Sequence, residues 1–214
     1  MSDRFSRVRS VLGEDFNKLQ QANVLLLGVG GVGGVCLDAL FRTGVGQMTI
    51  VDDDVYDVTN QNRQLGSEAV GAIKVTHLAS LYPNVQAIHA YITPQWVENF
   101  DFSPYDVVID AIDDIPAKVA IATKVSEKLL SSSGSAKKID PTQIRYASIW
   151  KTHGDALAKK MRYELKKSGF KGDFITVFSP EEPLCKELGS LMCVTGSFGF
   201  TLASLAIRKI LGSI

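Results

Sequence analysis

The sequence predicts an α/β protein with a mostly parallel sheet and helices on both faces. Short apolar runs alternate with amphipathic segments along most of the chain, and the first run ends in a glycine-rich turn, Gly28-Val-Gly30-Gly31-Val-Gly33. A second apolar run ends in Asp52, 19 residues after Gly33. This order is typical of a mononucleotide-binding strand–helix–strand unit, so the sheet is predicted to be Rossmann-like.

Each residue of this motif has a physical role in the prediction. Gly28 and Gly30 allow a tight turn that brings backbone N–H groups close to a phosphate. Gly33 lets the helix pack against the strand, and Asp52 can accept a hydrogen bond from a ribose hydroxyl. An α/β turn without a ligand is the alternative, and an acid at this distance makes it the weaker interpretation.

The remaining elements follow in chain order. An amphipathic arm is expected over 4–21, a nucleotide loop over 53–66, and a small-residue-rich apolar helix over 196–211. Strands are predicted at 24–28, 47–52, 85–91 and 106–110, and helices at about 32–43, 68–80 and 115–130. Residues 131–135, Ser-Ser-Ser-Gly-Ser, fit either a flexible linker or a short strand with a glycine-rich loop. C-terminal strands and the last helix are expected to complete a single domain, 1–214.

Amide and cationic side chains follow the second predicted strand. Asn60, Asn62 and Arg63 lie in one short stretch, and Lys74 follows them. Arg63 and Lys74 could neutralise β- and γ-phosphates, while the two asparagines hold oxygens and fix the loop. A nicotinamide cofactor requires no such group of side chains, so the pattern favours a nucleoside triphosphate.

Carboxylates end a later apolar run. Val107-Val-Ile-Asp110 precedes Asp113 and Asp114, and strand ends on this side of a parallel sheet face the ligand crevice. Asp113 is predicted to hold Mg²⁺, with phosphate oxygens as further ligands. One of Asp113 and Asp114 is expected to cap the following helix instead.

Composition predicts a cytoplasmic protein without membrane insertion. The 214 residues suffice for one domain with a substantial core, and no apolar run approaches the ~20 residues of a membrane helix. The first residues lack the charged-then-apolar form of a secretory signal. The three cysteines are too scattered for a disulfide framework, and Cys36 and Cys193 are expected to pack in the interior.

Together these motifs resemble the ubiquitin-activating-enzyme-like (ThiF/MoeB) superfamily of adenylyltransferases. The resemblance covers about residues 4–135, which it identifies as a nucleotide-binding core. It implies that the protein binds ATP and Mg²⁺ and adenylates a carboxylate, with release of pyrophosphate. The positions that match the nucleotide and metal residues of the family are Gly31, Asp52, Asn60, Asn62, Arg63, Lys74 and Asp113.

The resemblance also implies a homodimer. The helix at 196–211 falls in a region that contributes to a dimer interface in the superfamily. Arg7 lies where some members carry an arginine that reaches the phosphates bound by the partner subunit, so Arg7 joins Arg63, Lys74 and Asp113 as a candidate catalytic residue. Residues 131–135 match a short strand and loop beside the ATP, which favours that interpretation over a linker.

Charge is unevenly distributed along the chain. The formal net charge is zero, yet residues 137–172 hold ten lysines and arginines and only three acids. Leu157, Met161 and Leu165 have helical spacing, with a cationic face opposite. This face is either solvated surface or an RNA-binding patch. The candidate tRNA-binding residues are Lys137, Lys138, Arg145, Lys151, Lys159, Lys160, Arg162, Lys166 and Lys167.

The same region narrows the resemblance. Residues 139–144, 151–165, 177–179 and 198–200 look like those of the bacterial tRNA threonylcarbamoyladenosine dehydratases. The resemblance implies that ATP adenylates the threonyl carboxylate of the modified adenosine at tRNA position 37. The carbamoyl nitrogen or oxygen then closes a ring and AMP leaves, with proximity supplying much of the rate.

Two other function classes compete with this prediction. An adenylyltransferase acting on the C-terminal glycine of a small sulfur-carrier protein is disfavoured by the basic segment and by the lack of Cys-x-x-Cys pairs for zinc. A dinucleotide-binding or redox module is disfavoured by Arg63, Lys74 and Asp113. The sequence leaves open whether a sulfur or redox partner protein binds. The stretch from Phe178 to Gly196 is shorter than in the dehydratases, and its Cys185 is either a reactive thiol or a loop cysteine.

Overall fold

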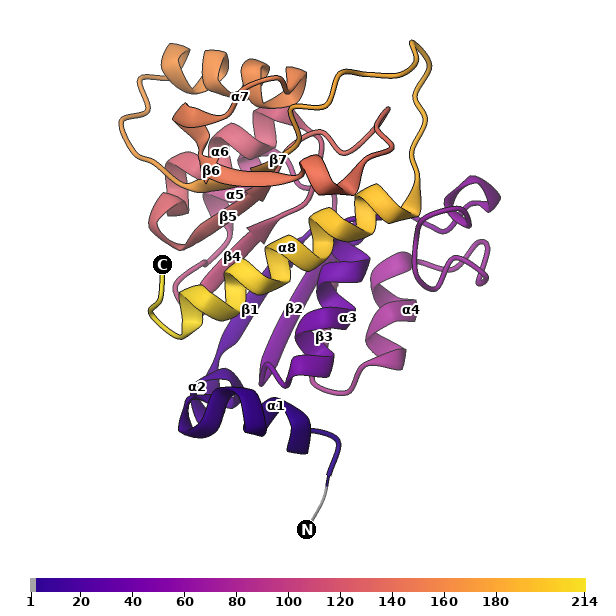
Figure 1. The fold of residues 1–214 in the computed structure, drawn as a ribbon, viewed down its shortest axis with the longest axis vertical. Coiled ribbons are helices and arrows are strands. Elements are labelled where there is room, and N and C mark those ends of the chain that lie inside the picture. The colour runs from indigo at the N-terminus through magenta and orange to yellow at the C-terminus, as the bar shows by residue number, and fades with distance from the viewer. Residues whose placement is uncertain (1–2) are drawn as a thin grey trace.

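The apolar runs of the sequence form a seven-stranded sheet in the computed structural model, which describes residues 3–214 (Figure 1). The strand order is β3-β2-β1-β4-β5-β7-β6, and only the edge strand β6 runs antiparallel to its neighbour. The strands are β1 (Asn23–Leu27), β2 (Gln47–Asp52), β3 (Val85–His89), β4 (Val107–Asp110), β5 (Leu129–Ser132), β6 (Arg145–Ser148) and β7 (Ile175–Phe178). The predicted fold class is confirmed.

Helices cover both faces of this sheet, and each face has its own hydrophobic cluster. The α-helices are α1 (Ser6–Leu12), α2 (Phe16–Gln21), α3 (Gly33–Thr43), α4 (Lys74–Leu81), α5 (Pro94–Asn99), α6 (Ile115–Val125), α7 (Ala156–Lys167) and α8 (Met192–Ile210). Leu37 of α3 and Phe198 of α8 lie in one cluster, while Ile121 of α6 and Met161 of α7 lie in the other. No helix within 3–214 has the length and apolar character needed to cross a bilayer.

The glycine-rich turn joins β1 to α3 as the sequence predicts. Gly28 has a φ of 86°, a conformation that disfavours residues with a Cβ. A Cβ on Gly33 would lie 1.9 Å from the carbonyl oxygen of Gly28, so only glycine permits this approach of helix to strand. Gly33 therefore allows the first turn of α3 to pack closely against the end of β1.

Several predicted boundaries are wrong. Helix α4 begins at Lys74 instead of residue 68, because the chain before it folds back through a bridge between Val55 and Ile73. Helix α6 ends at Val125, and residues 129–132 form β5, because their backbone pairs with β4 on one side and β7 on the other. Helix α8 begins at Met192, and α5 and β6 were not predicted. For residues 131–135 we expected a short strand followed by a loop, and the strand is confirmed because β5 ends at Ser132.

Candidate functional site

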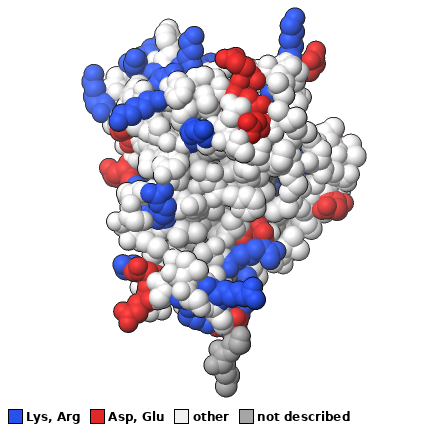
Figure 2. Space-filling model, viewed as in Figure 1, with Lys and Arg blue, Asp and Glu red and all other residues white. Residues whose placement is uncertain are grey.

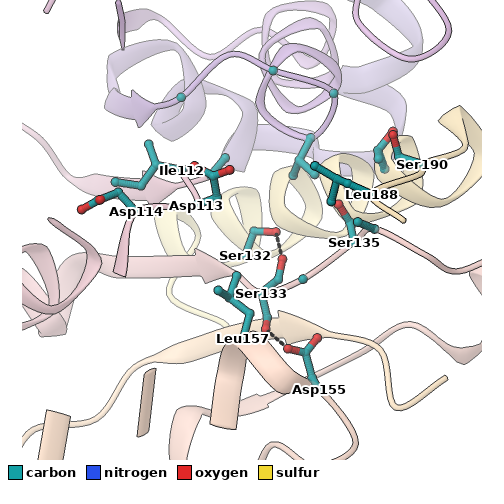
Figure 3. Close-up of a pocket in the computed structure, with 18 of the residues that line it drawn as sticks. Ile112, Asp113, Asp114, Ser132, Ser133, Ser135, Asp155, Leu157, Leu188 and Ser190 are labelled. Atoms are coloured by element: carbon teal, nitrogen blue, oxygen red, sulfur yellow. Dashed lines mark hydrogen bonds between the residues drawn. The ribbon is translucent and has the colours of Figure 1, made fainter. Parts of the chain in front are cut away.

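A cavity of about 1100 Å³ opens at the carboxyl ends of β1, β2, β4 and β5. Its lining comes from the glycine-rich turn, the ends of β2 and β4, the loop after β5, the first turns of α7 and the loop before α8. In Figure 3, Ser132 and Ser133 lie between the turn that carries Asp113 and the start of α7. Both the segment 4–135 and the segment 136–214 thus contribute to one cavity. We call these contributions the amino-terminal wall and the carboxy-terminal wall.

The turn after β1 presents backbone donors to the cavity. Gly30 and Gly31 line it, and their N–H groups make no hydrogen bond within the described residues. Asp52 Oδ2 accepts a hydrogen bond from Val29 N at 2.8 Å, and its Oδ1 accepts one from Asp54 N at 2.9 Å. Burial raises the pKa of Asp52, and these backbone hydrogen bonds oppose the rise. The geometry combines free donors for an anion with a carboxylate at the end of β2.

Two cations stand beside this turn. The Lys74 side chain is buried, and its Nζ lies 2.7 Å from Oδ2 of the exposed Asp54. Nη1 of Arg63 donates to the Thr59 carbonyl oxygen and to Oδ1 of Asn62, at 2.9 Å each. Nε and Nη2 of Arg63 make no hydrogen bond in 3–214, and both cations line the cavity. They are placed to neutralise a bound polyanion.

The two asparagines fix the loop between β2 and α4. Oδ1 of Asn60 accepts from Asp57 N at 3.1 Å, and Nδ2 of Asn62 donates to the Ser190 carbonyl oxygen at 2.9 Å. The Asn62 bond ties this loop to the segment before α8. Neither asparagine is among the residues that line the cavity, so a direct nucleotide contact for either one stays a prediction.

The paired aspartates after β4 divide their roles. Oδ1 of Asp114 accepts a hydrogen bond from Ala117 N at 2.8 Å and caps α6. Asp113 is exposed, lines the cavity, and makes no hydrogen bond from its carboxylate within the described residues (Figure 3). A free carboxylate at a strand end has the chemistry of a Mg²⁺ ligand. The cluster Asp52, Asp53 and Asp54 fits less well, because two of its carboxylates are already hydrogen-bonded.

A buried ion pair that was not predicted holds the amino-terminal wall. Nζ of Lys118 on α6 lies 2.7 Å from Oδ2 of Asp110, and both side chains are almost fully buried. The same Nζ donates to the carbonyl oxygens of Ile112, at 3.1 Å, and Ser132, at 2.8 Å. Ser131 Oγ donates a further hydrogen bond to Asp110 Oδ2 at 2.8 Å. The sequence signal that could have predicted this pair is Lys118, a lysine on the apolar side of the predicted helix 115–130.

A second buried pair lies in the carboxy-terminal wall. Asp155 caps α7 through Ala158 N at 2.9 Å and accepts a hydrogen bond from Ser133 Oγ at 2.5 Å (Figure 3). Nζ of Lys138 lies 3.5 Å from Asp155 Oδ2 and donates to the Ser179 carbonyl oxygen. Lys138 was predicted as a tRNA contact. The structure instead buries it in the cavity wall, because Asp155 and Ser179 take up its ammonium group.

The other candidate tRNA-binding residues fall into two groups. Lys137, Lys159, Lys160 and Arg162 line the cavity, and a guanidinium nitrogen of Arg162 donates to the Thr152 hydroxyl. Basic side chains gather over α7 at the top of Figure 2. The candidates that the structure places outside the lining are Arg145, Lys151, Lys166 and Lys167.

The segment 179–191 passes the cavity as a loop without regular structure (Figure 1). Glu181 fastens it by accepting hydrogen bonds from Ile139 N at 2.9 Å and Asp140 N at 3.0 Å. Leu188 lines the cavity although it is 87% exposed.

The cysteines have three different environments. Cys185 is exposed on the 179–191 loop, outside the cavity lining, with its Sγ 3.3 Å from the Glu187 carbonyl oxygen. Cys36 is buried in the core as predicted, and burial raises the pKa of its thiol. The prediction for Cys193 is wrong, because the first turn of α8 directs this side chain to solvent.

Arg7 is exposed on α1, which precedes β1 at the amino end of the sheet. Figure 1 shows α1 at the bottom of the view, with α7 at the top. The cavity lies at the opposite, carboxyl ends of the strands, and Arg7 does not line it. Within one chain Arg7 is therefore separated from the candidate phosphate site.

The geometry was compared with known proteins. The ThiF family model matches residues 4–213. The chain belongs to the ThiF family. It is 38% identical over 196 residues to a tRNA threonylcarbamoyladenosine dehydratase of Bacillus subtilis, covering 86% of this chain and 77% of the relative.

Two Escherichia coli comparisons agree with this ThiF family membership. A tRNA threonylcarbamoyladenosine dehydratase of strain K12 is 30% identical over 250 residues, which covers 97% of this chain and 93% of the relative. The crystal structure of the E. coli enzyme TcdA in complex with ATP superimposes with a TM-score of 0.90 at 33% identity, covering 98% of this chain and 94% of that one. The single-domain Rossmann-like architecture is thus shared with an ATP-binding relative.

Proposed function

We propose that this protein is an ATP-dependent tRNA threonylcarbamoyladenosine dehydratase. The observation that carries the proposal is the composition of one cavity with two walls. The amino-terminal wall offers the free N–H groups of Gly30 and Gly31 with Arg63 and Lys74. The carboxy-terminal wall is basic and ends at the exposed surface of α7. A nucleoside triphosphate and an RNA substrate can therefore meet in the same cavity.

The proposed reaction begins with activation of a carboxylate. A carboxylate oxygen of the threonyl group attacks the α-phosphorus of ATP, the bond to the bridging oxygen breaks, and pyrophosphate leaves. Arg63, Lys74 and the glycine-rich turn stabilise the charge that moves onto the phosphates. Asp113 would hold Mg²⁺, which neutralises further phosphate charge. In this proposal Asp52 accepts a hydrogen bond from the ribose.

Ring closure follows without a protein nucleophile. The carbamoyl group of the same nucleoside attacks the activated carbonyl carbon, AMP leaves with the electron pair of the broken bond, and a carbamoyl N–H proton is released to solvent. The reacting groups belong to one nucleoside, so the effective concentration is high and the protein needs only to hold the geometry. The exposed Cys185 has no step in this scheme.

A homodimer would complete the site. Arg7 lies away from the cavity of its own chain, so the proposed contact with phosphates requires a second copy. The exposed side of α8, with Phe200 59% exposed, is the proposed contact face. A tRNA substrate would place the enzyme in the cytoplasm.

Activation of a sulfur-carrier glycine is the second function considered. An extended carrier tail would need an open groove, whereas α7 brings the basic side chains of Lys159, Lys160 and Arg162 to the cavity. A sulfur or redox partner protein has no site that the described residues define, so none is part of the proposal.

The test is pyrophosphate–ATP exchange. The protein is supplied with ATP, labelled pyrophosphate and tRNA that carries threonylcarbamoyladenosine, and a parallel reaction contains a small sulfur-carrier protein instead. Exchange that depends on the tRNA, with loss of one water from the modified nucleoside by mass spectrometry, supports the proposal. Exchange with the carrier alone would overturn it.

A further inference from the structure

Helix α7 carries an exposed aromatic residue that neither the core nor the cavity uses. The side chain of Tyr163 is 64% exposed, and its hydroxyl makes no hydrogen bond within residues 3–214. The buried side of α7 is formed by Ala158, Met161 and Leu165. Tyr163 points away from that side, so removing its ring leaves the packing of the helix intact.

The surroundings of Tyr163 are cationic in every direction along the helix. Residues three and four positions apart are neighbours on a helix surface. The four positions at these spacings from Tyr163 are 159, 160, 166 and 167, and all four are exposed lysines. Glu164, 3.9 Å from Lys167, is the acid that this helix contributes among residues 156–167.

Helix geometry also relates Tyr163 to the cavity. Side chains on a helix lean toward its N-terminus. Tyr163 therefore leans toward the turn that carries Lys159 and Lys160, and both of these lysines line the cavity. Leu157, one further turn back, points to the cavity beside Ser133 (Figure 3). The aromatic ring thus lies just outside the rim, about one helical turn from it.

We infer that Tyr163 is a stacking platform for an unpaired RNA base adjacent to the nucleotide whose modified base enters the cavity. This inference rests on the proposed function and names how the RNA is held. Recognition of single-stranded RNA combines aromatic faces, on which splayed bases stack, with cations that contact the flanking phosphates. An exposed tyrosine between four lysines supplies both, and the charge complements a polynucleotide. A paired duplex keeps its bases stacked on one another and gains little from the ring.

The test compares two RNA probes on the full-length protein. One probe is the anticodon stem–loop hairpin of a tRNA that decodes ANN codons, and the other is a blunt duplex of equal length. Tyr163→Ala should weaken hairpin binding by about 5- to 150-fold, the range expected for one lost base stack. Duplex binding and the slope of log K against log salt should stay at wild-type values, because no phosphate contact is lost. Tyr163→Phe and Tyr163→Trp should retain hairpin affinity, since both keep an aromatic face.

Tyr146→Ala is the matched control. Tyr146 is an exposed tyrosine on β6 that contacts Arg208 of α8, so it lies on the other face of the sheet from α7. Its removal should leave hairpin binding unchanged. The inference is overturned if Tyr163→Ala binds the hairpin like wild type, or weakens hairpin and duplex equally. If the wild-type protein itself neither prefers the hairpin nor shows RNA-dependent pyrophosphate exchange, the proposed function fails, whatever the variants do.

Discussion

A buried lysine–aspartate pair stabilises each wall of the cavity, and the two pairs differ in how completely they are bonded. In the amino-terminal wall, Lys118 contacts Asp110 at 2.7 Å and donates to two backbone carbonyl oxygens. In the carboxy-terminal wall, Lys138 lies 3.5 Å from Asp155, which takes its closer hydrogen bonds from a serine hydroxyl and a backbone N–H. The first pair joins helix α6 to the end of β4 and, through the Ser132 carbonyl oxygen, to β5, whereas the second joins a loop to the start of α7.

From this difference we expect the amino-terminal wall to be more rigid than the carboxy-terminal wall. Register between β4 and β5 fixes the positions of Asp110 and Ser131, so the floor beside Asp113 follows from the sheet itself. The position of α7 depends on the bonds of Asp155 and on packing against α6.

The sharpest test of the contrast is to neutralise each buried lysine. Lys118→Met leaves the Asp110 carboxylate buried without its cation, and we expect a loss of about 3–5 kcal/mol in the free energy of unfolding. Lys138→Met leaves Asp155 with its bonds to Ser133 and Ala158, so the expected loss is smaller, about 1–3 kcal/mol. Urea denaturation followed by circular dichroism measures both. An equal or larger loss for Lys138→Met would contradict the proposed difference between the walls.

Removing either cation of the amino-terminal wall should lower the rate of adenylation strongly and change the stability of the fold little. Arg63→Ala and Lys74→Ala each remove a charge placed to act on phosphates, which is expected to cost about 2–4 kcal/mol of transition-state stabilisation. Lys74→Ala leaves only the exposed Asp54 without a partner, so the unfolding midpoint should stay near that of the wild type. Pyrophosphate–ATP exchange and thermal denaturation are measured on the same samples. Wild-type exchange in Arg63→Ala would remove that residue from the proposed site.

The two walls also differ in how well the sequence predicts them. The sequence placed Gly28, Asp52 and Asp113 at strand ends that line the cavity, because strand–turn–helix units fix their spacing along the chain. The burial of Lys138 was not predicted, because it depends on Asp155 and Ser179, which lie far from it in the sequence. Sequence periodicity carries no information on such contacts.

Boundaries failed for the same reason. Leu129 and Leu130 were assigned to the predicted helix 115–130, but the pairing of their strand with β4 and β7 overrides that local preference. Strand β6 has only four residues and pairs with β7 alone at the edge of the sheet, so no period-two pattern in the sequence predicts it. Long-range pairing decided both outcomes.

Substitutions of the neighbouring Asp113 and Asp114 should have smaller effects, and the two can be compared directly. Asp113→Asn should raise the Mg²⁺ concentration required for exchange, because an amide is a weaker ligand than a carboxylate, and leave stability unchanged. Asp114→Ala should instead cost about 1 kcal/mol of stability through loss of the helix cap, with the Mg²⁺ requirement unchanged. Mg²⁺ titration of exchange and denaturant unfolding separate the two effects. A shift in the Mg²⁺ requirement for Asp114→Ala alone would reverse the assignment.

Surface lysines of the carboxy-terminal wall should show the smallest effect per residue. Two double variants, Lys159→Gln with Lys160→Gln and Lys166→Gln with Lys167→Gln, probe the inner and outer turns of α7. If these lysines contact RNA phosphates, each lost contact should flatten the slope of log K against log salt by roughly one unit. ATP affinity should stay near wild type, because the phosphate-binding groups belong to the amino-terminal wall. If tRNA affinity and salt slope are unchanged in both variants, the helix face is solvated surface. RNA recognition would then depend on Lys137 and the loop after Phe178, because Lys138 is already engaged inside the wall.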